Sequence, residues 1–137
     1  MPPQAHAVVA HLTPLTVFEF AGPLQKFVMV ILVVAMVAAL AVLALKLGGG
    51  KRLSGGSAFL SGLRLGAPVI GILGACDSGL NMTLAVASVP IEVTPKMLAP
   101  GIAESFLMVG LGFLAGAIAV VAHWAVESRI DRQVLGA

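Results

Sequence analysis

The chain has 137 residues, of which 59% are hydrophobic and 10% are charged, and its mean hydropathy is +1.07. Soluble domains carry about 25% charged residues, so this composition excludes a water-covered domain and makes membrane lipid the expected partner of much of the surface. The net charge of +2 is spread along the chain, without the basic clusters that nucleic-acid binding requires.

The N-terminal segment before the first long apolar run has neither the basic start nor the apolar stretch of a signal peptide, so cleavage is not expected. Its apolar side chains suit a short segment on the outer surface of the membrane. These side chains are Leu15, Val17, Phe18 and Phe20.

Three apolar stretches are long enough to cross a bilayer, which predicts an all-α integral membrane protein with one domain over residues 1–137. Phe27–Leu45 contains no charge, glycine or proline, and as a helix it measures about 29 Å. Pro100 suits the first turn of the third helix. The predicted spans cover about residues 26–47, 65–89 and 100–126, with a short cytoplasmic loop at 48–64.

The basic residues predict the orientation of these spans. Six of them fall on one side of the predicted topology, namely Lys46, Lys51, Arg52, Arg64, Arg129 and Arg132, and two on the other, Lys26 and Lys96. Because the side richer in Lys and Arg stays in the cytoplasm, we expect a cytoplasmic C-terminus and a periplasmic N-terminus in a bacterial inner membrane.

Two carboxylates fall inside the predicted spans. Asp77 lies near the middle of the second, where an aspartate costs about 2.5 to 3.5 kcal/mol. Asn81, Ser88 and Gly74 share its helix face. The stripe fits either an Asp77–Asn81 hydrogen-bonded pair that joins helices or a carboxylate in an ion path. Glu104 falls in the second turn of the third span, where the helix dipole favours an acid or where a pore entrance would use its proton.

Small residues recur at the spacing of close helix contacts. Gly71 and Gly74 lie in the second span, preceded by Gly62 and Gly66, and Gly112 and Gly116 lie in the third span. Small residues let helix backbones approach in lipid, which predicts tight packing either within one subunit or between subunits.

No motif indicates an enzyme. The three histidines, His6, His11 and His123, lack the spacing of a metal site. The chain has no phosphate-binding loop, nucleophile elbow or zincin helix, so no catalytic residue, metal or cofactor is expected.

Three segments, in order, resemble parts of the MotA/TolQ/ExbB proton channel family. Ala21–Met29 is similar to the start of that family's first span, and Gly66–Gly74 to its second. Leu98–Ser105, which reads LAPGIAES, resembles the APGIAEAL motif that opens the third span.

The resemblance implies a pentamer whose second and third helices line a pore around single-span partners of the ExbD/TolR type. Proton flow would then drive a periplasmic partner of the TonB/TolA type. Glu104 takes the position of the family's third-span glutamate, which is thought to take part in coupling.

The sequence also departs from the family. Only about residues 48–63 separate the first two spans, where the family has a large cytoplasmic domain. Ala75 and Val109 stand at the pore-lining positions where the family has threonines, and Ile118 replaces a proline. Asp77 has no family counterpart and lies about 200° around the helix from Ala75.

Two functions are therefore expected. The first is an ExbB/TolQ-like subunit that couples proton flow to a periplasmic or outer-membrane transport process through Glu104, Asp77 and Asn81. The alternative is a structural or accessory subunit that keeps the oligomeric scaffold without conducting.

Overall fold

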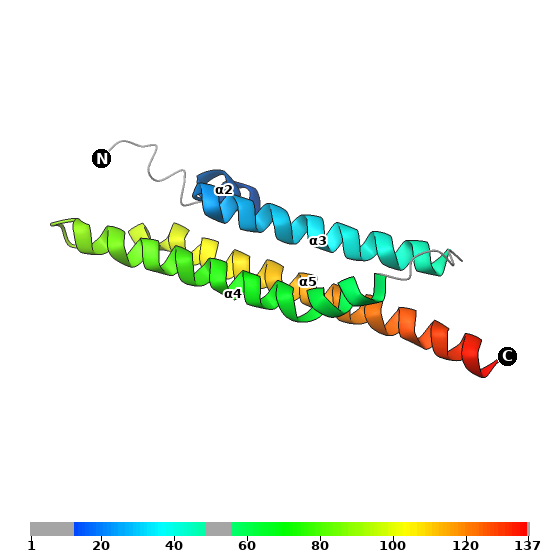
Figure 1. The fold of residues 1–137 in the computed structure, drawn as a ribbon. Helices are drawn as coiled ribbons and strands as arrows, with labels where there is room; N and C mark the ends of the chain where they lie inside the picture. Colours follow the sequence, from blue (N-terminus) through cyan, green and yellow to red (C-terminus); the bar gives the residue numbers. More distant parts are fainter. Residues whose placement is uncertain (1–12, 49–55, 137) are drawn as a thin grey trace.

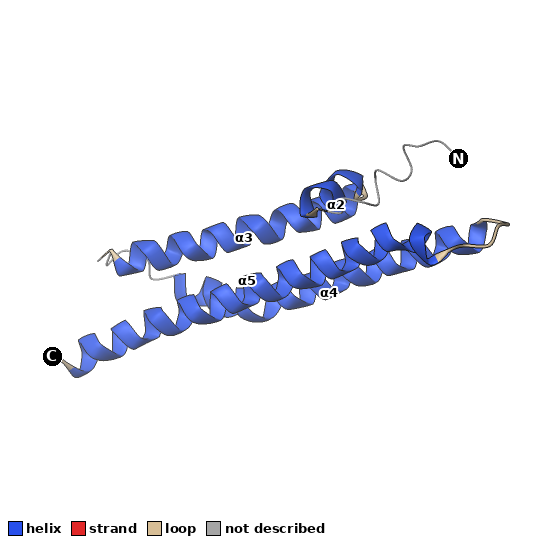
Figure 2. Cartoon of the chain, turned by 180° about the vertical axis from the view of Figure 1, so that it is seen from behind, coloured by secondary structure: helices blue, strands red, loops and turns tan. Residues whose placement is uncertain are grey.

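The computed structural model describes residues 13–48 and 56–136, apart from the side chain of Gln133. Within those residues the fold is entirely helical (Figures 1 and 2), and three of the four helices are long and apolar enough to cross a membrane. The helices are α2 (Pro14–Phe20), α3 (Pro23–Leu47), α4 (Gly56–Ser88) and α5 (Pro95–Leu135). This confirms the all-α class and the three spans, whereas the side on which each terminus lies stays a prediction.

The boundary between the first two spans differs from the expectation. The helix α4 is described from Gly56 onward, so the last nine residues of the loop expected at 48–64, Gly56 to Arg64, are helical. Gly56 packs against α3: a Cβ on Gly56 would lie 2.8 Å from Val42 Cγ1. Lys51 and Arg52, two of the basic residues used to predict orientation, lie outside the described residues.

The third span also has different ends. Pro95, not Pro100, occupies the first helical turn of α5, and Thr94 is the N-cap residue. Pro100 lies inside the helix, and Glu104 therefore lies in the third turn, not the second. The helix continues past Val126 to Leu135 because the charged segment beyond the apolar run is made of residues that also favour helix.

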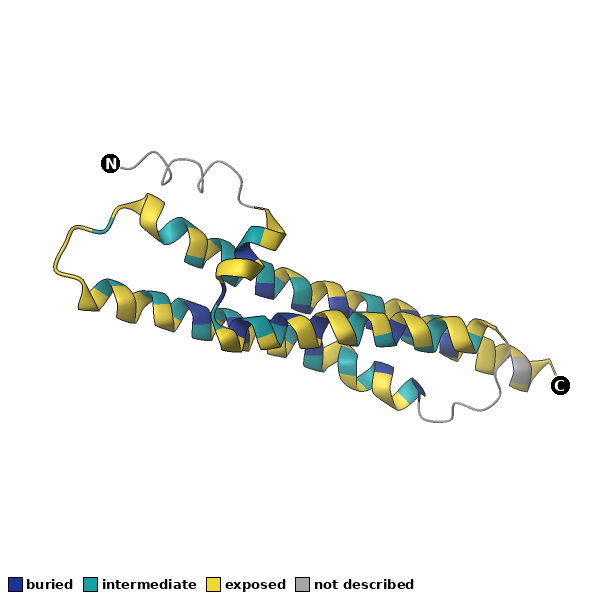
Figure 3. Cartoon of the chain, turned by 90° about the horizontal axis from the view of Figure 1, so that it is seen from above, coloured by how far each residue is buried: buried dark blue, intermediate teal, exposed yellow. Residues whose placement is uncertain are grey.

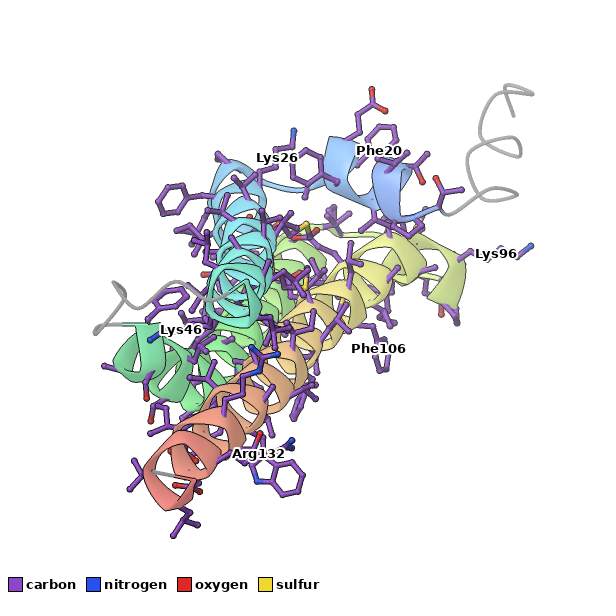
Figure 4. The ribbon with its side chains drawn as sticks, turned by 90° about the vertical axis from the view of Figure 1, so that its right-hand side faces the viewer. Phe20, Lys26, Lys46, Lys96, Phe106 and Arg132 are labelled. Atoms are coloured by element: carbon purple, nitrogen blue, oxygen red, sulfur yellow. The ribbon has the colours of Figure 1, made fainter. Side chains whose placement is uncertain are left out.

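The short helix α2 lies beside the start of α3 and packs on α5 (Figure 4). A capping box begins it: the Thr13 hydroxyl accepts from the Thr16 backbone N–H at 3.4 Å, and Thr16 Oγ1 accepts from the Thr13 N–H at 2.9 Å. Val17 is buried against the bundle, while Leu15 and Phe20 are 80% and 72% exposed. This pattern is that of a helix with one face on protein and the other on an apolar surface.

The three long helices pack along most of their length, with α4 antiparallel to α3 and α5 (Figure 1). The buried residues lie where the helices face one another (Figure 3), and most of them are small. Three clusters of buried residues follow the bundle axis: Ala39, Leu60, Ala122 and Val126; Leu32, Ala67 and Ala115; and Ala21, Met29 and Met108. Small core residues bring the helix axes close together, as expected in lipid.

α4 and α5 come closest where two glycines face each other. A Cβ on Gly71 would lie 2.8 Å from Gly112 Cα, and one on Gly112 would lie 2.8 Å from the Ala67 carbonyl oxygen. One turn along each helix, Gly74 meets Met108 Sδ and Gly116 meets Pro68. These four glycines therefore pack within the subunit.

Gly62 and Gly66 are different, because a Cβ on either would meet nothing within 4 Å. Their face of α4 points away from the other described helices. Glycine packing within this chain thus accounts for only part of the small-residue pattern in the sequence.

Candidate functional site

A polar cluster lies at the end of the bundle where α3 begins. Asp77 Oδ2 accepts two hydrogen bonds, from Asn81 Nδ2 at 3.2 Å and from Gln25 Nε2 at 3.0 Å. The Asp77–Asn81 hydrogen bond that the helical spacing predicts is therefore present. Ser88, expected on the same stripe, instead donates to the Ala85 carbonyl of its own helix at 2.8 Å and takes no part in the cluster.

Gln25 is the member of the cluster that the sequence interpretation missed. It exposes only 6% of its surface although it lies in the first turn of α3. Its position was visible in one pattern: Gln25, Met29 and Leu32 recur at the spacing of one helix face, and all three are buried. An amide at the head of a buried stripe needs a hydrogen-bond partner, and Asp77 provides it.

The Gln25 contact also shows where Asp77 lies relative to the first span. The sequence placed this carboxylate near the middle of the second span. Because α4 begins at Gly56 and Asp77 binds a residue in the first turn of α3, the carboxylate lies level with the start of the first span. A carboxylate near the end of a span costs less to insert than one at the bilayer centre.

Glu104 reaches the same region from α5. It lines an open cleft of about 400 Å³ together with Gln25, Ser78 and Asn81. The Ser78 side chain, which is buried, hydrogen-bonds the Glu104 carboxyl group, and the charge of Asp77 acts on it. The cluster therefore draws on all three long helices. α3 contributes the Gln25 amide, α4 contributes Asp77, Ser78 and Asn81, and α5 contributes Glu104.

Gly101 makes room for this arrangement. A Cβ at Gly101 would lie 2.9 Å from Met82 Sδ, so the glycine allows α4 to approach α5 one turn before Glu104. The neighbouring Ser105 hydroxyl donates to the Gly101 carbonyl at 3.0 Å and lies 3.5 Å from the Ala75 carbonyl oxygen. Ser105 therefore supplies a hydroxyl beside Ala75, although the side chain at 75 itself has none.

Neither carboxylate of the cluster has a cationic partner among the described residues. The acid–base contact that occurs in this part of the chain is between His123 Nδ1 and Glu127 Oε1 at 3.5 Å, toward the opposite end of α5, and it is an ion pair only when the histidine is protonated. Within the same residues no group of three or more metal-binding side chains occurs. Among the described residues, the hydrogen-bonding partners of Asp77 and Glu104 are two amides and a hydroxyl, all of them neutral.

The two family positions that lack a threonine lie inside the subunit or at its edge. Ala75 packs beside the core cluster that contains Met29 and Met108. Val109 is half-buried on α5. Ala75 therefore faces core side chains of its own subunit.

A comparison with family models adds an independent finding. The model of the MotA/TolQ/ExbB proton channel family matches residues 49–136, which is more than half of the chain and includes α4, α5 and Glu104. Searches of curated proteins and of solved structures returned no match. The chain belongs to the MotA/TolQ/ExbB proton channel family.

Proposed function

We propose that the protein is an ExbB/TolQ-like subunit of a bacterial inner-membrane complex, in which proton flow does work on a periplasmic or outer-membrane transport process. Family membership supports a proton-channel type of membrane function. The observation that carries the finer proposal is the position of Glu104 in an open polar cleft, beside Ser78 and within the field of Asp77.

In this proposal Glu104 is the group that takes up and releases the proton. Two carboxylates without a cationic partner repel each other when both are ionised, so the loss of a proton from one makes ionisation of the other more costly. Ser78 hydrogen-bonds Glu104, and Asn81 donates to Asp77, so each carboxylate has a neutral polar partner on α4. Proton transfer into the cleft would in this way change the charge that α4 and α5 present to a partner.

The assembly belongs to the proposal as well. Large apolar side chains are exposed on all three long helices, among them Phe27 at 63%, Phe106 at 74% and Trp124 at 79%. Such a surface needs lipid or further protein around it. A homo-oligomer, a pentamer by family resemblance, would cover part of it and surround a single-span ExbD/TolR-like partner linked to a TonB/TolA-like protein.

A second function has observations of its own. Ala75 and Val109 carry no hydroxyl where the family has threonines, and only residues 49–55 separate α3 and its C-cap from α4. These features favour a non-conducting subunit that keeps the scaffold of the family and anchors a larger complex.

Proton flux into liposomes decides between the two. Purified protein is reconstituted with and without a single-span partner, and wild type is compared with Glu104→Gln and Asp77→Asn. We expect at least one substitution to lower the flux about a hundredfold or more while the oligomer persists, which is the usual size of the loss of a group that transfers a proton. Ser88→Ala is the matched control, because its hydroxyl bonds only its own helix. If wild type gives no flux above empty liposomes even with the partner, the scaffold function holds instead.

A further inference from the structure

A buried amide joins α3 to α4. Gln25 exposes 6% of its surface, and its Nε2 donates to Asp77 Oδ2 at 3.0 Å. Among the described residues, this is the side-chain hydrogen bond that connects α3 to α4. Other side-chain hydrogen bonds between helices join Ser78 of α4 to Glu104 of α5, Ser105 of α5 to α4, and Arg129 of α5 to α3. The position of the Asp77 carboxylate therefore depends on a helix that contributes no carboxylate of its own to the cluster.

The amide also lies between the surroundings of the two carboxylates. Gln25 lines the polar cleft that contains Glu104, and it lines a separate apolar pocket of about 250 Å³ that contains Asp77. Gly22, one turn before Gln25, leaves the space that the amide occupies, because a Cβ at Gly22 would collide with Gln25 Oε1. Room for the amide is thus built into the first turn of α3.

The charges around Asp77 explain why the amide matters. From α5 the ionisable group that acts on the cluster is Glu104, and from α4 the neighbour is the neutral Asn81. From α3 the contact is the neutral Gln25. Lys26, the next residue of α3, forms no ion pair with either carboxylate among the described residues. Glu104 would carry a like charge, and no cation pairs with Asp77. An ionised Asp77 therefore depends on the N–H groups of Gln25 and Asn81 that donate to it.

We infer that Gln25 is a positioning residue for Asp77: its buried amide fixes the carboxylate on the α3 side of the cluster and favours its ionised form beside Glu104. The inference rests on the proposed function, in which the two carboxylates handle the proton together. It assigns to the first span a direct part in setting the pH dependence of the cluster.

Two substitutions of Gln25 test this by moving a measured pH dependence in opposite directions. Gln25→Met keeps the length of the side chain and removes the donor, and Gln25→Lys adds a cation beside Asp77. The flux of the reconstituted oligomer is measured against pH in wild type and in each variant. The titration step that is compared is the one missing from the profile of Asp77→Asn. We expect its midpoint to move up by about one pH unit in Gln25→Met, the size expected for losing one hydrogen bond to a charged group. In Gln25→Lys the midpoint should move down.

The Asp77→Asn background provides the control, because both shifts should vanish there, and Ser88→Ala should cause none. Gly22→Ala, which presses on the amide without removing it, should act like Gln25→Met but more weakly. A purely structural role predicts that Met and Lys disturb the packing alike. Midpoints that move in the same direction, or shifts that survive in Asp77→Asn, would overturn the inference.

An infrared titration of the Asp77 carboxyl group, identified by its loss in Asp77→Asn, separates this inference from the proposed function. It requires no proton flux. Opposite shifts in the infrared titration together with absent wild-type flux would reject the channel and retain the positioning role. Wild-type flux with no infrared shift in either variant would retain the channel and reject the positioning role.

Discussion

At the scale of single residues, Gly71 and Gly112 set the distance between α4 and α5. Each would place a Cβ within 2.8 Å of a backbone atom of the opposite helix, and backbone cannot move aside as a flexible side chain can. The fold therefore depends on the absence of two methyl groups at this crossing.

Gly112→Ala should lower stability because the added methyl overpacks the crossing, at a cost of about 1–3 kcal/mol. Thermal unfolding in detergent, followed by circular dichroism, measures the change. Gly110→Ala is the matched control on the same helix, since a Cβ there meets nothing within 4 Å. Alanine favours helix over glycine by about 1 kcal/mol, so the control should be neutral or stabilising. Equal losses in both variants would show that the crossing is looser than described.

For the two carboxylates, the sequence located the residues more readily than their hydrogen-bond partners. The motif LAPGIAES located Glu104 from the sequence alone, because the motif is continuous along the chain. The partners of Glu104 and Asp77 were harder to identify, since Ser78 had no distinguishing pattern and Gln25 lies 52 residues from Asp77. The contact between them exists only when α3 and α4 are packed.

At the scale of elements, the long α5 is tied to α3 at the end opposite the polar cluster. The Arg129 guanidinium donates to the Leu47 carbonyl oxygen at 3.0 Å. Leu47 is the last residue of α3, and the last carbonyls of a helix have no partner within it. Arg129 thus caps one helix from another, and a cation suits the negative end of the helix dipole.

Arg129→Ala should loosen the last turn of α3 without unfolding the bundle, because it removes one exposed hydrogen bond worth about 0.5–1.5 kcal/mol. Hydrogen exchange of the backbone amides before Gly48 should become faster by up to about tenfold. Arg132→Ala changes an exposed arginine one turn further along α5 and serves as the control. Unchanged exchange in Arg129→Ala would mean that the contact does not persist in solution.

Helix boundaries were the element-scale feature that sequence interpretation located least well. Pro100 was assigned to the first turn of its helix because proline suits that position, but Pro95 suits it equally and lies earlier. Glycine and serine near residue 56 indicated a loop, yet Gly56 and Ser57 are helical and Gly56 lies in close contact with Val42. In both cases the local preference of a single residue type was not enough to locate the helix.

At the scale of the whole molecule, the single chain leaves much apolar surface uncovered. Part of it is the face of α4 that carries Gly62 and Gly66, which have no neighbour within 4 Å of an added Cβ. In the proposed homo-oligomer this face is available to a second copy of the chain.

Gly66→Leu tests that arrangement. Because the subunit has space for a larger side chain there, helix content and thermal unfolding of the subunit should change little. The mass of the detergent-solubilised complex, measured by light scattering, should fall if the face packs against another subunit, since a leucine keeps two backbones apart. Val37→Phe, at an exposed position of α3, is the control for bulk on an outward surface. An oligomer of unchanged mass would place this face of α4 in lipid.

The sequence by itself determined the all-α membrane fold, its three spans, the family resemblance and the position of Glu104, because hydropathy, helical spacing and a continuous motif are local properties. The tertiary structure decided which glycines pack within the subunit, where α4 and α5 begin, and that Gln25 holds Asp77 level with the start of α3. These features depend on the distance and register between helices, which are fixed by the side chains of two or three segments at once. The residue pattern along one helix does not determine how far that helix lies from its neighbours.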